Sequence, residues 1–335
     1  MAPTPTKTII ITGAGGFIGP LLASRLLSDP SYRIILTDLR NAAVPPGVAY
    51  PENATVLEGD ISSPEFVTSL LRAAGTPLSA VFVFHGIMSA GSEADWDLSL
   101  RVNVDSVREL VLALRREYPA PSNGPVRVIY ASSQAVYGQP LPASGIVTDS
   151  VTPTPEGTYG SHKLMTEILL NDMHRRGFLD VFSLRFPTIS VRPGRPTNAA
   201  SSFLSGMIRE PMHGEPCVVP LRDRSFRSFL CSPATLLENL VRVLHMPSDR
   251  LPRHVRHINF PGVSASIQEL LDALAKHGGE DRLKFVSEET DPNLERILRS
   301  WAPEMDTSTS LRLGLVKDES PDALVKQYVD SLKSS

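Results

Sequence analysis

The chain has 335 residues, 41% of them hydrophobic, and a formal net charge of -3, so it can bury one large core or two unequal lobes. This charge gives no field for a polyanion, and nucleic acid is therefore not an expected partner. Cys217 and Cys231 are too few for a disulfide framework, which indicates a reducing compartment. No signal-like apolar core opens the sequence and no apolar run could span a bilayer, so we expect a cytoplasmic protein that does not enter a membrane.

A short apolar strand over residues 8–12 runs into a glycine cluster and then into an apolar helical stretch that ends near Leu27. The spacing GxGxxG fails because its last glycine would fall on Ile18, whereas GxxGxxG fits. Glycines at this spacing permit a tight turn and the close approach of a pyrophosphate to a helix N-terminus. The predicted cofactor contacts in this turn are Gly13, Gly16, Phe17, Ile18 and Gly19.

A second buried strand over residues 33–38 ends in a carboxylate, Asp38, at nearly the interval from the glycines expected for a ribose-binding acid. Such an acid accepts hydrogen bonds from the ribose hydroxyls and repels a 2′-phosphate, which favours NAD over NADP. Arg40 lies close enough in sequence to accommodate that phosphate, so NADP remains open as an alternative.

Two further strands are predicted, one ending at Asp60 and one over residues 80–84. A helix predicted over residues 95–116 carries Asn103 within its apolar stripe. That amide is either a satisfied core group or a tether between strand ends that could also relay water. The cofactor contacts predicted in this part of the chain are Asp60, Ile61, His85, Gly86 and Asn103.

A fifth strand over residues 126–130 leads to Ser132 and Ser133, and a sixth covers residues 180–185. Alternating strands and helices predict an α/β fold, a Rossmann-type doubly wound parallel sheet whose ligands lie outside the carboxyl ends of its strands. Between these two strands, Tyr159 and Lys163 share one helical face. A free tyrosine keeps its proton until about pH 10, but a fixed ammonium and a cationic nicotinamide would both favour the phenolate.

The segment 186–233 is rich in Pro, Arg and Ser and predicts only short elements, as in a substrate-covering region. We therefore predict an NAD-binding domain over residues 1–185 and a smaller, mainly substrate-binding lobe over residues 186–335, interleaved with the first. Ser63 in the first domain and Ser232, Ser266 and Ser320 in this lobe are each predicted to start a helix. The arginines of this lobe suggest an anionic substrate, and the candidates are Arg192 or Arg195, Arg209, Arg222, Arg224 and Arg227. His254 and His257 lack further ligands, so no metal site is predicted.

Taken together, these motifs resemble the extended short-chain dehydrogenase/reductase superfamily, also called the NAD-dependent epimerase/dehydratase superfamily. In its Ser-Ser-x-x-x-Tyr-Gly pattern, which here covers residues 132–138, the second hydroxyl is catalytic, and it falls on Ser133. Pro155 precedes Tyr159 as in many members. Gly86 departs from the usual His-x-Ala-Ala and leaves extra room near the ribose.

Within that superfamily the chain resembles the D-erythronate dehydrogenases, in segments 159–163, 185–194, 198–203, 208–211 and 296–301. Sugar-nucleotide epimerases usually have Asn in place of Thr188 and a Gly-Pro ending where this chain has Arg192-Pro193-Gly194, which argues against a nucleotide-sugar substrate. The resemblance implies NAD-dependent oxidation of the C2 hydroxyl of D-erythronate, or of a similar small polyhydroxy acid, to the 2-oxo acid.

In this scheme Tyr159 is the general base, Lys163 lowers its pKa and holds the nicotinamide ribose, and Ser133 orients the reacting oxygen. Pro187 is a further cofactor contact. The implied substrate contacts are Ser133, Gln134, Thr188, Arg192, Ser201, Arg209 and Arg227, with Arg227, Arg209 or both expected to hold the substrate carboxylate. The family also suggests a homodimer. The alternatives are a carbonyl reductase or nucleotide-sugar epimerase on the same scaffold, and a non-catalytic NAD-binding redox sensor, a class that commonly loses the tyrosine or lysine.

Overall fold

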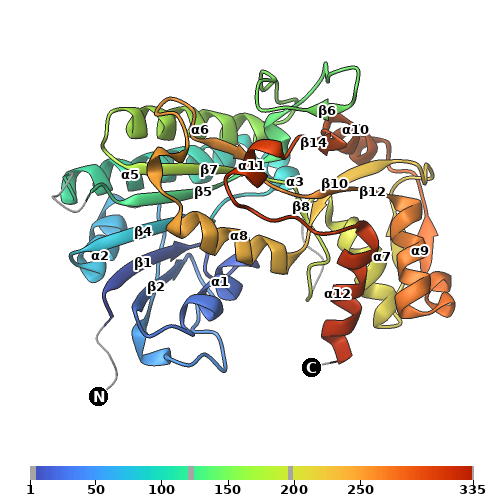
Figure 1. Cartoon of the computed structure of the whole chain (residues 1–335), viewed down its shortest axis with the longest axis horizontal. Coiled ribbons are helices and arrows are strands. Elements are labelled where there is room, and N and C mark those ends of the chain that lie inside the picture. Colours follow the sequence, from blue (N-terminus) through green and yellow to red (C-terminus); the bar gives the residue numbers. More distant parts are fainter. Residues whose placement is uncertain (1–4, 120–123, 195–198, 334–335) are drawn as a thin grey trace.

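The computed structural model describes residues 5–119, 124–194 and 199–333 (Figure 1). Its centre is a parallel sheet with the strand order β11-β7-β5-β4-β1-β2-β3. These strands are β1 (Lys7–Thr12), β2 (Tyr32–Asp38), β3 (Ala54–Glu58), β4 (Leu78–Val83), β5 (Arg127–Ser133), β7 (Asp180–Phe186) and β11 (His257–Asn259). The order reverses direction between β1 and β4, so the predicted doubly wound sheet is confirmed.

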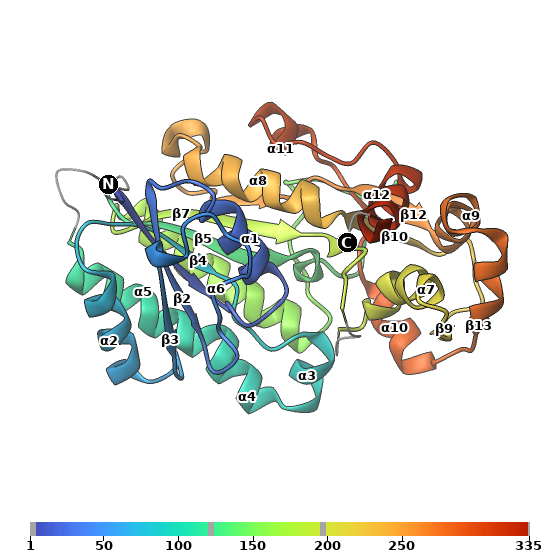
Figure 2. The same ribbon diagram turned by 90° about the horizontal axis from the view of Figure 1, so that it is seen from below.

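Helices cover both faces of this sheet (Figure 2). One face packs on α2 (Pro64–Ala74), α5 (Ser106–Glu117) and α6 (Thr158–Arg175), and the other on α1 (Ile18–Leu26) and α8 (Pro233–His245). Successive strand residues point to opposite faces, so both sides of each strand need apolar residues. In β1, for example, Ile10 packs in the first layer whereas Ile9 and Ile11 pack in the second.

A smaller lobe lies beside the carboxyl ends of the large sheet, on the right in Figure 1. Its three-stranded sheet has the order β12 (Val263–Ser266), β10 (Arg227–Cys231), β8 (Thr188–Ile189). Its main helices are α7 (Ser202–Met212), α9 (Ile267–Gly278), α10 (Pro292–Ser300) and α12 (Pro321–Lys333). Further short elements are two strand pairs, β9 (Cys217–Val219) with β13 (Val286–Glu288) and β6 (Ile146–Val147) with β14 (Glu304–Met305). In addition, α3 (Ser89–Ala94) follows β4, and α11 (Ser308–Arg312) contacts β11 of the large sheet.

Two elements from the C-terminal half, α8 and β11, belong to the layers of the large sheet. The chain therefore enters the smaller lobe after β7, returns to the large sheet through α8 and β11, and leaves it again. That residues 1–185 bind NAD and residues 186–335 mainly bind the substrate remains a proposal.

The helix starts predicted from the sequence are confirmed. Ser63 and Ser232 each accept a hydrogen bond from a backbone N–H of the first turn, and each is followed by proline. Ser266 forms a reciprocal capping box with Glu269, and Ser320 accepts from the amide of Ala323. No helix among the described residues has the length and apolar character needed to cross a membrane.

The single helix predicted over residues 95–116 is instead interrupted. Asp95 caps the short α4 (Trp96–Leu100), a π-helical turn follows over Arg101–Asp105, and α5 begins at Ser106. The wider turn carries Asn103. Such π-turns insert one extra residue into a helix and redirect the side chains that they carry.

The segment 186–233 also differs from expectation, because α7 is a full eleven-residue helix. Its buried face includes Phe203, Leu204, Met207 and Ile208, which recur at helical intervals. Pro211 lies in its last turn and the helix ends one residue later, at Met212. The Pro, Arg and Ser content of the surrounding segment concealed this periodicity.

Candidate active site

A cavity of about 330 Å³ opens at the carboxyl ends of the central strands and is closed on its far side by residues of the smaller lobe. This is the position at which parallel doubly wound sheets bind their ligands. Of the residues predicted from the sequence, those that line it are Gly13, Gly16, Phe17, Ile18, Gly86, Ser133, Gln134, Tyr159, Lys163, Pro187, Thr188, Arg192 and Ser201. Those that do not are Gly19, Asp38, Asp60, Ile61, His85, Asn103, Arg209 and Arg227.

The glycine turn between β1 and α1 has no room for side chains at two of its glycines. Gly13 has a φ of +69°, and a Cβ there would lie 2.7 Å from the backbone nitrogen of His85. A Cβ on Gly19 would lie 2.7 Å from the carbonyl oxygen of Gly13. The turn therefore depends on these glycines, and Gly16 between them faces the cavity. This arrangement fits a dinucleotide at the amino end of α1.

Asp38 ends β2 beside this turn. Its carboxylate accepts hydrogen bonds from the backbone nitrogens of Gly15 (2.9 Å) and Leu39 (2.7 Å), while the nearby Arg40 is exposed. Asp60 and Ile61 lie just beyond β3, and hydrogen bonds from Ser62 lower the pKa of the Asp60 carboxyl. The predicted contacts of Asp38, Asp60 and Ile61 with the adenosine end of the cofactor remain predictions.

His85 braces the strand ends with its ring. One ring nitrogen lies 2.7 Å from the hydroxyl of Thr12 and the other 2.9 Å from that of Ser106. Burial, assisted by the charge of Lys163, lowers the pKa of His85 to about 3. The imidazole is therefore neutral, and it joins β1 to the segment after β4 and to α5.

Asn103 is a satisfied core amide, and it ties the segment after β4 to its own helical stretch but does not join two strand ends. Its Oδ1 accepts from the backbone nitrogen of Ile87 at 2.8 Å, and its Nδ2 donates to the carbonyl of Ile87 at 3.1 Å and to Ser99 at 3.0 Å. A Cβ on Gly86 would lie 2.8 Å from Oδ1. Glycine at position 86 therefore lets the backbone lie between this tether and the cavity.

Ser133, Tyr159 and Lys163 meet on the wall of the cavity, where the end of β5 faces the first turns of α6. The Nζ atom of Lys163 donates to the carbonyl of Ala131 at 2.7 Å and lies 5.5 Å from the centroid of the Tyr159 ring. Burial lowers the pKa of Lys163 to about 8, and the charge of Glu167 opposes that shift.

The tyrosine requires help to act as a base. Burial raises the pKa of Tyr159 to about 12, whereas the charge of Arg192 and a hydrogen bond with Ser133 lower it. The amide of Ala135 donates to the Ser133 hydroxyl at 3.1 Å, which holds that side chain in place. A cationic nicotinamide would favour the phenolate further. The three residues can therefore perform proton transfer to or from an alcohol.

Only one of the three arginines in the predicted substrate set reaches the cavity. Arg192 lines it and donates from Nε to the carbonyl of Ile189. Arg209 is buried inside the smaller lobe and pairs with Glu210 at 2.6 Å, because α7 turns its face inward. Arg227 pairs with Glu269 at 3.0 Å on the exposed side of β10. Of these three arginines, Arg192 is therefore the one that we expect to bind the substrate carboxylate. The alternative Arg195 lies outside the described residues.

Other residues that line the cavity were not predicted as contacts from the sequence. Met88 and Ser89 follow β4, and Trp301, the residue after α10, reaches the cavity from more than a hundred residues away along the chain. No spacing rule links these positions. Glu167 does not line the cavity, but it lies one helical turn after Lys163 and could have been found from that spacing.

In the described part of the chain, no group of three or more His, Cys, Asp and Glu side chains could hold a metal ion. The two cysteines are buried and unpaired. Burial raises the pKa of Cys217 to about 12, which disfavours a thiolate ligand.

The NAD dependent epimerase/dehydratase family matches residues 9–232 of this chain. The chain is 35% identical to the D-erythronate dehydrogenase of Haemophilus influenzae, over 96% of its own length and 98% of the relative. It is also 35% identical to the D-erythronate dehydrogenase of Cupriavidus necator, with the same coverage. Among solved structures, a nucleoside-diphosphate-sugar epimerase from Agrobacterium tumefaciens superposes with a TM-score of 0.89 at 30% identity and covers 99% of this chain and 97% of its own. The chain therefore belongs to the NAD dependent epimerase/dehydratase family and is an NAD-dependent oxidoreductase that acts on CH–OH groups.

Proposed function

We propose that this enzyme oxidises the C2 hydroxyl of D-erythronate, or of a similar small polyhydroxy acid, to the 2-oxo acid. The observation that carries the proposal is the meeting of Ser133, Tyr159 and Lys163 in a cavity that also holds the cation of Arg192. Similarity over nearly the full length to two D-erythronate dehydrogenases supports the choice of substrate.

Each residue has a separate task in this reaction. NAD, when bound, supplies the hydride acceptor. Tyr159 takes the proton of the substrate hydroxyl, and Ser133 orients the same oxygen through a hydrogen bond. Lys163 favours the phenolate through its positive charge and has its position fixed by the Ala131 carbonyl. Arg192 holds the substrate carboxylate, while Arg209 and Arg227 act at most through the packing of the lobe.

A redox sensor and a nucleotide-sugar epimerase fit the cavity less well than this dehydrogenase. A redox sensor without chemistry would not need the complete set of Ser133, Tyr159 and Lys163. A nucleotide-sugar epimerase would need space for a nucleoside diphosphate, whereas bulky side chains of the smaller lobe, among them Trp301, border this cavity. A carbonyl reductase is the same chemistry in reverse and differs only in the substrate that it prefers.

The test measures NADH absorbance with NAD and a panel of four-carbon 2-hydroxy acids, for the wild type and for Tyr159→Phe. Removal of one positioned acid/base group lowers turnover by about 10²–10⁴. We therefore expect at least a 10²-fold loss with NAD affinity nearly unchanged. Tyr50→Phe, outside the cavity, is the matched control and should match the wild type. Normal turnover in Tyr159→Phe would refute the tyrosine as base, and absence of NADH with every acid would refute the substrate.

We also propose that the chain forms a homodimer in the cytoplasm. Large apolar side chains are exposed on two neighbouring helices, Trp96 (55%) on α4 and Met165 (49%) and Ile168 (65%) on α6. Exposed apolar groups gathered on adjacent elements favour an interaction surface.

A further inference from the structure

The side-chain oxygen of Gln134 is buried without a partner. Gln134 directly follows Ser133, is 4% exposed and lines the cavity. Its Nε2 donates to the hydroxyl of Thr188 at 3.3 Å, but its Oε1 has no hydrogen-bond partner among the described residues. An unsatisfied buried acceptor destabilises the folded protein. A group of this kind facing a ligand cavity indicates that the ligand supplies the missing donor.

Thr188 complements this acceptor with a donor. It lies in β8, is 6% exposed and lines the same cavity. Its oxygen already accepts from Gln134, and no described residue accepts its hydroxyl proton. The pair therefore presents one free acceptor, Oε1 of Gln134, and one free donor, the O–H of Thr188.

The combination selects a particular chemical group. A hydroxyl can donate to Gln134 and accept from Thr188 with a single oxygen atom. An ammonium group can only donate, and a carboxylate or ketone can only accept. A methylene or methyl group can do neither, and would leave both protein groups unsatisfied.

We propose that Gln134 and Thr188 bind a second hydroxyl of the substrate, on the carbon next to the one oxidised, and thereby select vicinal dihydroxy acids. This inference rests on the proposed function, in which Ser133 and Tyr159 hold the reacting hydroxyl and Arg192 the carboxylate. Ser133 and Gln134 are neighbours along the chain and both line the cavity, which suits two oxygens on neighbouring carbons.

The kinetic test compares 2,3-dihydroxybutanoate with 2-hydroxybutanoate, which differ only in the second hydroxyl. A site built to bind a hydroxyl rejects the analogue that lacks it by large factors, so the wild type should prefer the dihydroxy acid by roughly 10²-fold or more in kcat/KM. In Gln134→Met, which keeps the size but loses the acceptor, that preference should fall at least tenfold. Thr188→Val removes the donor and should act in the same direction, so either variant suffices if the other does not fold.

Gln268→Met, on the exposed face of α9, is the matched control. An unchanged preference in both cavity variants, or an equal loss for both acids, would overturn the inference.

A binding measurement separates this inference from the proposed function. The melting temperature of the NADH-loaded enzyme is measured with each acid, in the wild type and in both variants. Stronger stabilisation by the dihydroxy acid, lost in the variants, supports the inference even if neither acid is oxidised and the proposed reaction therefore fails. Equal stabilisation by the two acids in the wild type, or none by either, would overturn it.

Discussion

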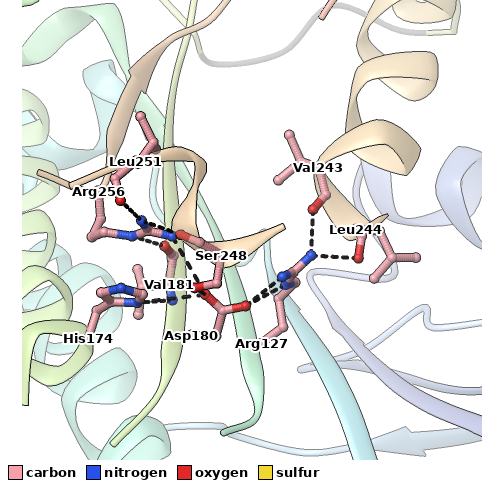
Figure 3. A network of polar contacts seen from close by, with 9 residues as sticks. All are labelled: Arg127, His174, Asp180, Val181, Val243, Leu244, Ser248, Leu251 and Arg256. Carbon is pink, nitrogen blue, oxygen red and sulfur yellow. Dashed lines mark hydrogen bonds and ion pairs between the residues drawn. The ribbon is translucent and has the colours of Figure 1, made fainter. Parts of the chain in front are cut away.

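Two buried ion networks lie at opposite ends of the same pair of strands, β5 and β7. At the carboxyl ends, Glu167 pairs with Arg185 at 2.6 Å, and both side chains are at most 5% exposed. At the amino ends, Asp180 pairs with Arg127 at 2.6 Å and lies 3.6 Å from Arg256 (Figure 3). The chemistry is alike, but only the first network adjoins the cavity.

The network at the carboxyl ends is connected to the reacting groups. Ser132, which precedes Ser133, donates to Glu167, and Arg185 donates to the hydroxyl of Tyr137 at 2.6 Å. The residue before Ser132 supplies the carbonyl that holds Lys163. Glu167 therefore holds this strand end through Ser132, and its charge raises the pKa of Lys163.

The network at the amino ends serves to attach a helix. Arg127 donates to the carbonyls of Val243 and Leu244 at the end of α8, and Ser248 donates to Asp180 (Figure 3). None of these residues lines the cavity. Buried charge in this fold thus has two separate uses, and burial alone does not distinguish them.

The largest effect is expected for Glu167→Gln, because it removes a buried charge from the network that adjoins the site. Removal of one partner of a buried ion pair costs about 3–5 kcal/mol of unfolding free energy. Without the negative charge, the pKa of Lys163 falls below its present value of about 8. A fall of about one unit leaves roughly a tenth of the ammonium form at higher pH, so the alkaline limb of the kcat profile should move to lower pH.

Tyr137→Phe is the control for this prediction, because it removes a hydrogen bond of Arg185 but leaves both charges of the pair. It should cost about 1 kcal/mol and leave the alkaline limb in place. The groups near Lys163 that could shift the limb independently are Tyr159 on α6, Tyr130 on β5 and His85 after β4. A loss of kcat in Glu167→Gln that is uniform across pH would show that Glu167 has only a structural role.

Asp180→Asn should produce a similar loss of stability with no change in catalysis. It leaves Arg127 and the fully buried Arg256 without their carboxylate, which again costs about 3–5 kcal/mol in urea denaturation. At temperatures where the variant is folded, kcat and KM should equal those of the wild type. Asp172→Asn breaks an exposed pair with Arg175 and should cost less than about 1 kcal/mol. Reduced kcat in folded Asp180→Asn would mean that the two networks are coupled along the strands.

The sequence predicted features that depend on local spacing. The strand-turn-helix at Gly13, the serine caps and the pairing of Tyr159 with Lys163 follow from residues a few positions apart. The choice of Ser133 came from its place at a strand end and from the family resemblance. The inward turn of Arg209 could not be predicted, since its burial depends on how α7 packs. The same holds for Trp301, whose place in the cavity depends on long-range packing between lobes.

The smallest of the three effects is a loss of folding stability at acid pH, which arises at His174 in the network at the amino ends. His174 accepts a hydrogen bond from the amide of Val181 at 3.0 Å, and burial, assisted by the charge of Arg256, lowers its pKa to about 4 despite the opposing charge of Asp180. The unfolded chain therefore binds more protons than the folded one between about pH 6.5 and pH 4. The stability contributed by neutral His174 is complete above that window and falls by up to roughly 3 kcal/mol as the pH drops through it.

His174→Gln keeps an acceptor for Val181 but does not titrate, so urea denaturation at pH 7 and pH 4.5 should show a smaller acid loss than in the wild type. Equal losses in the two proteins would assign the acid sensitivity to other histidines, such as His85, and not to this network.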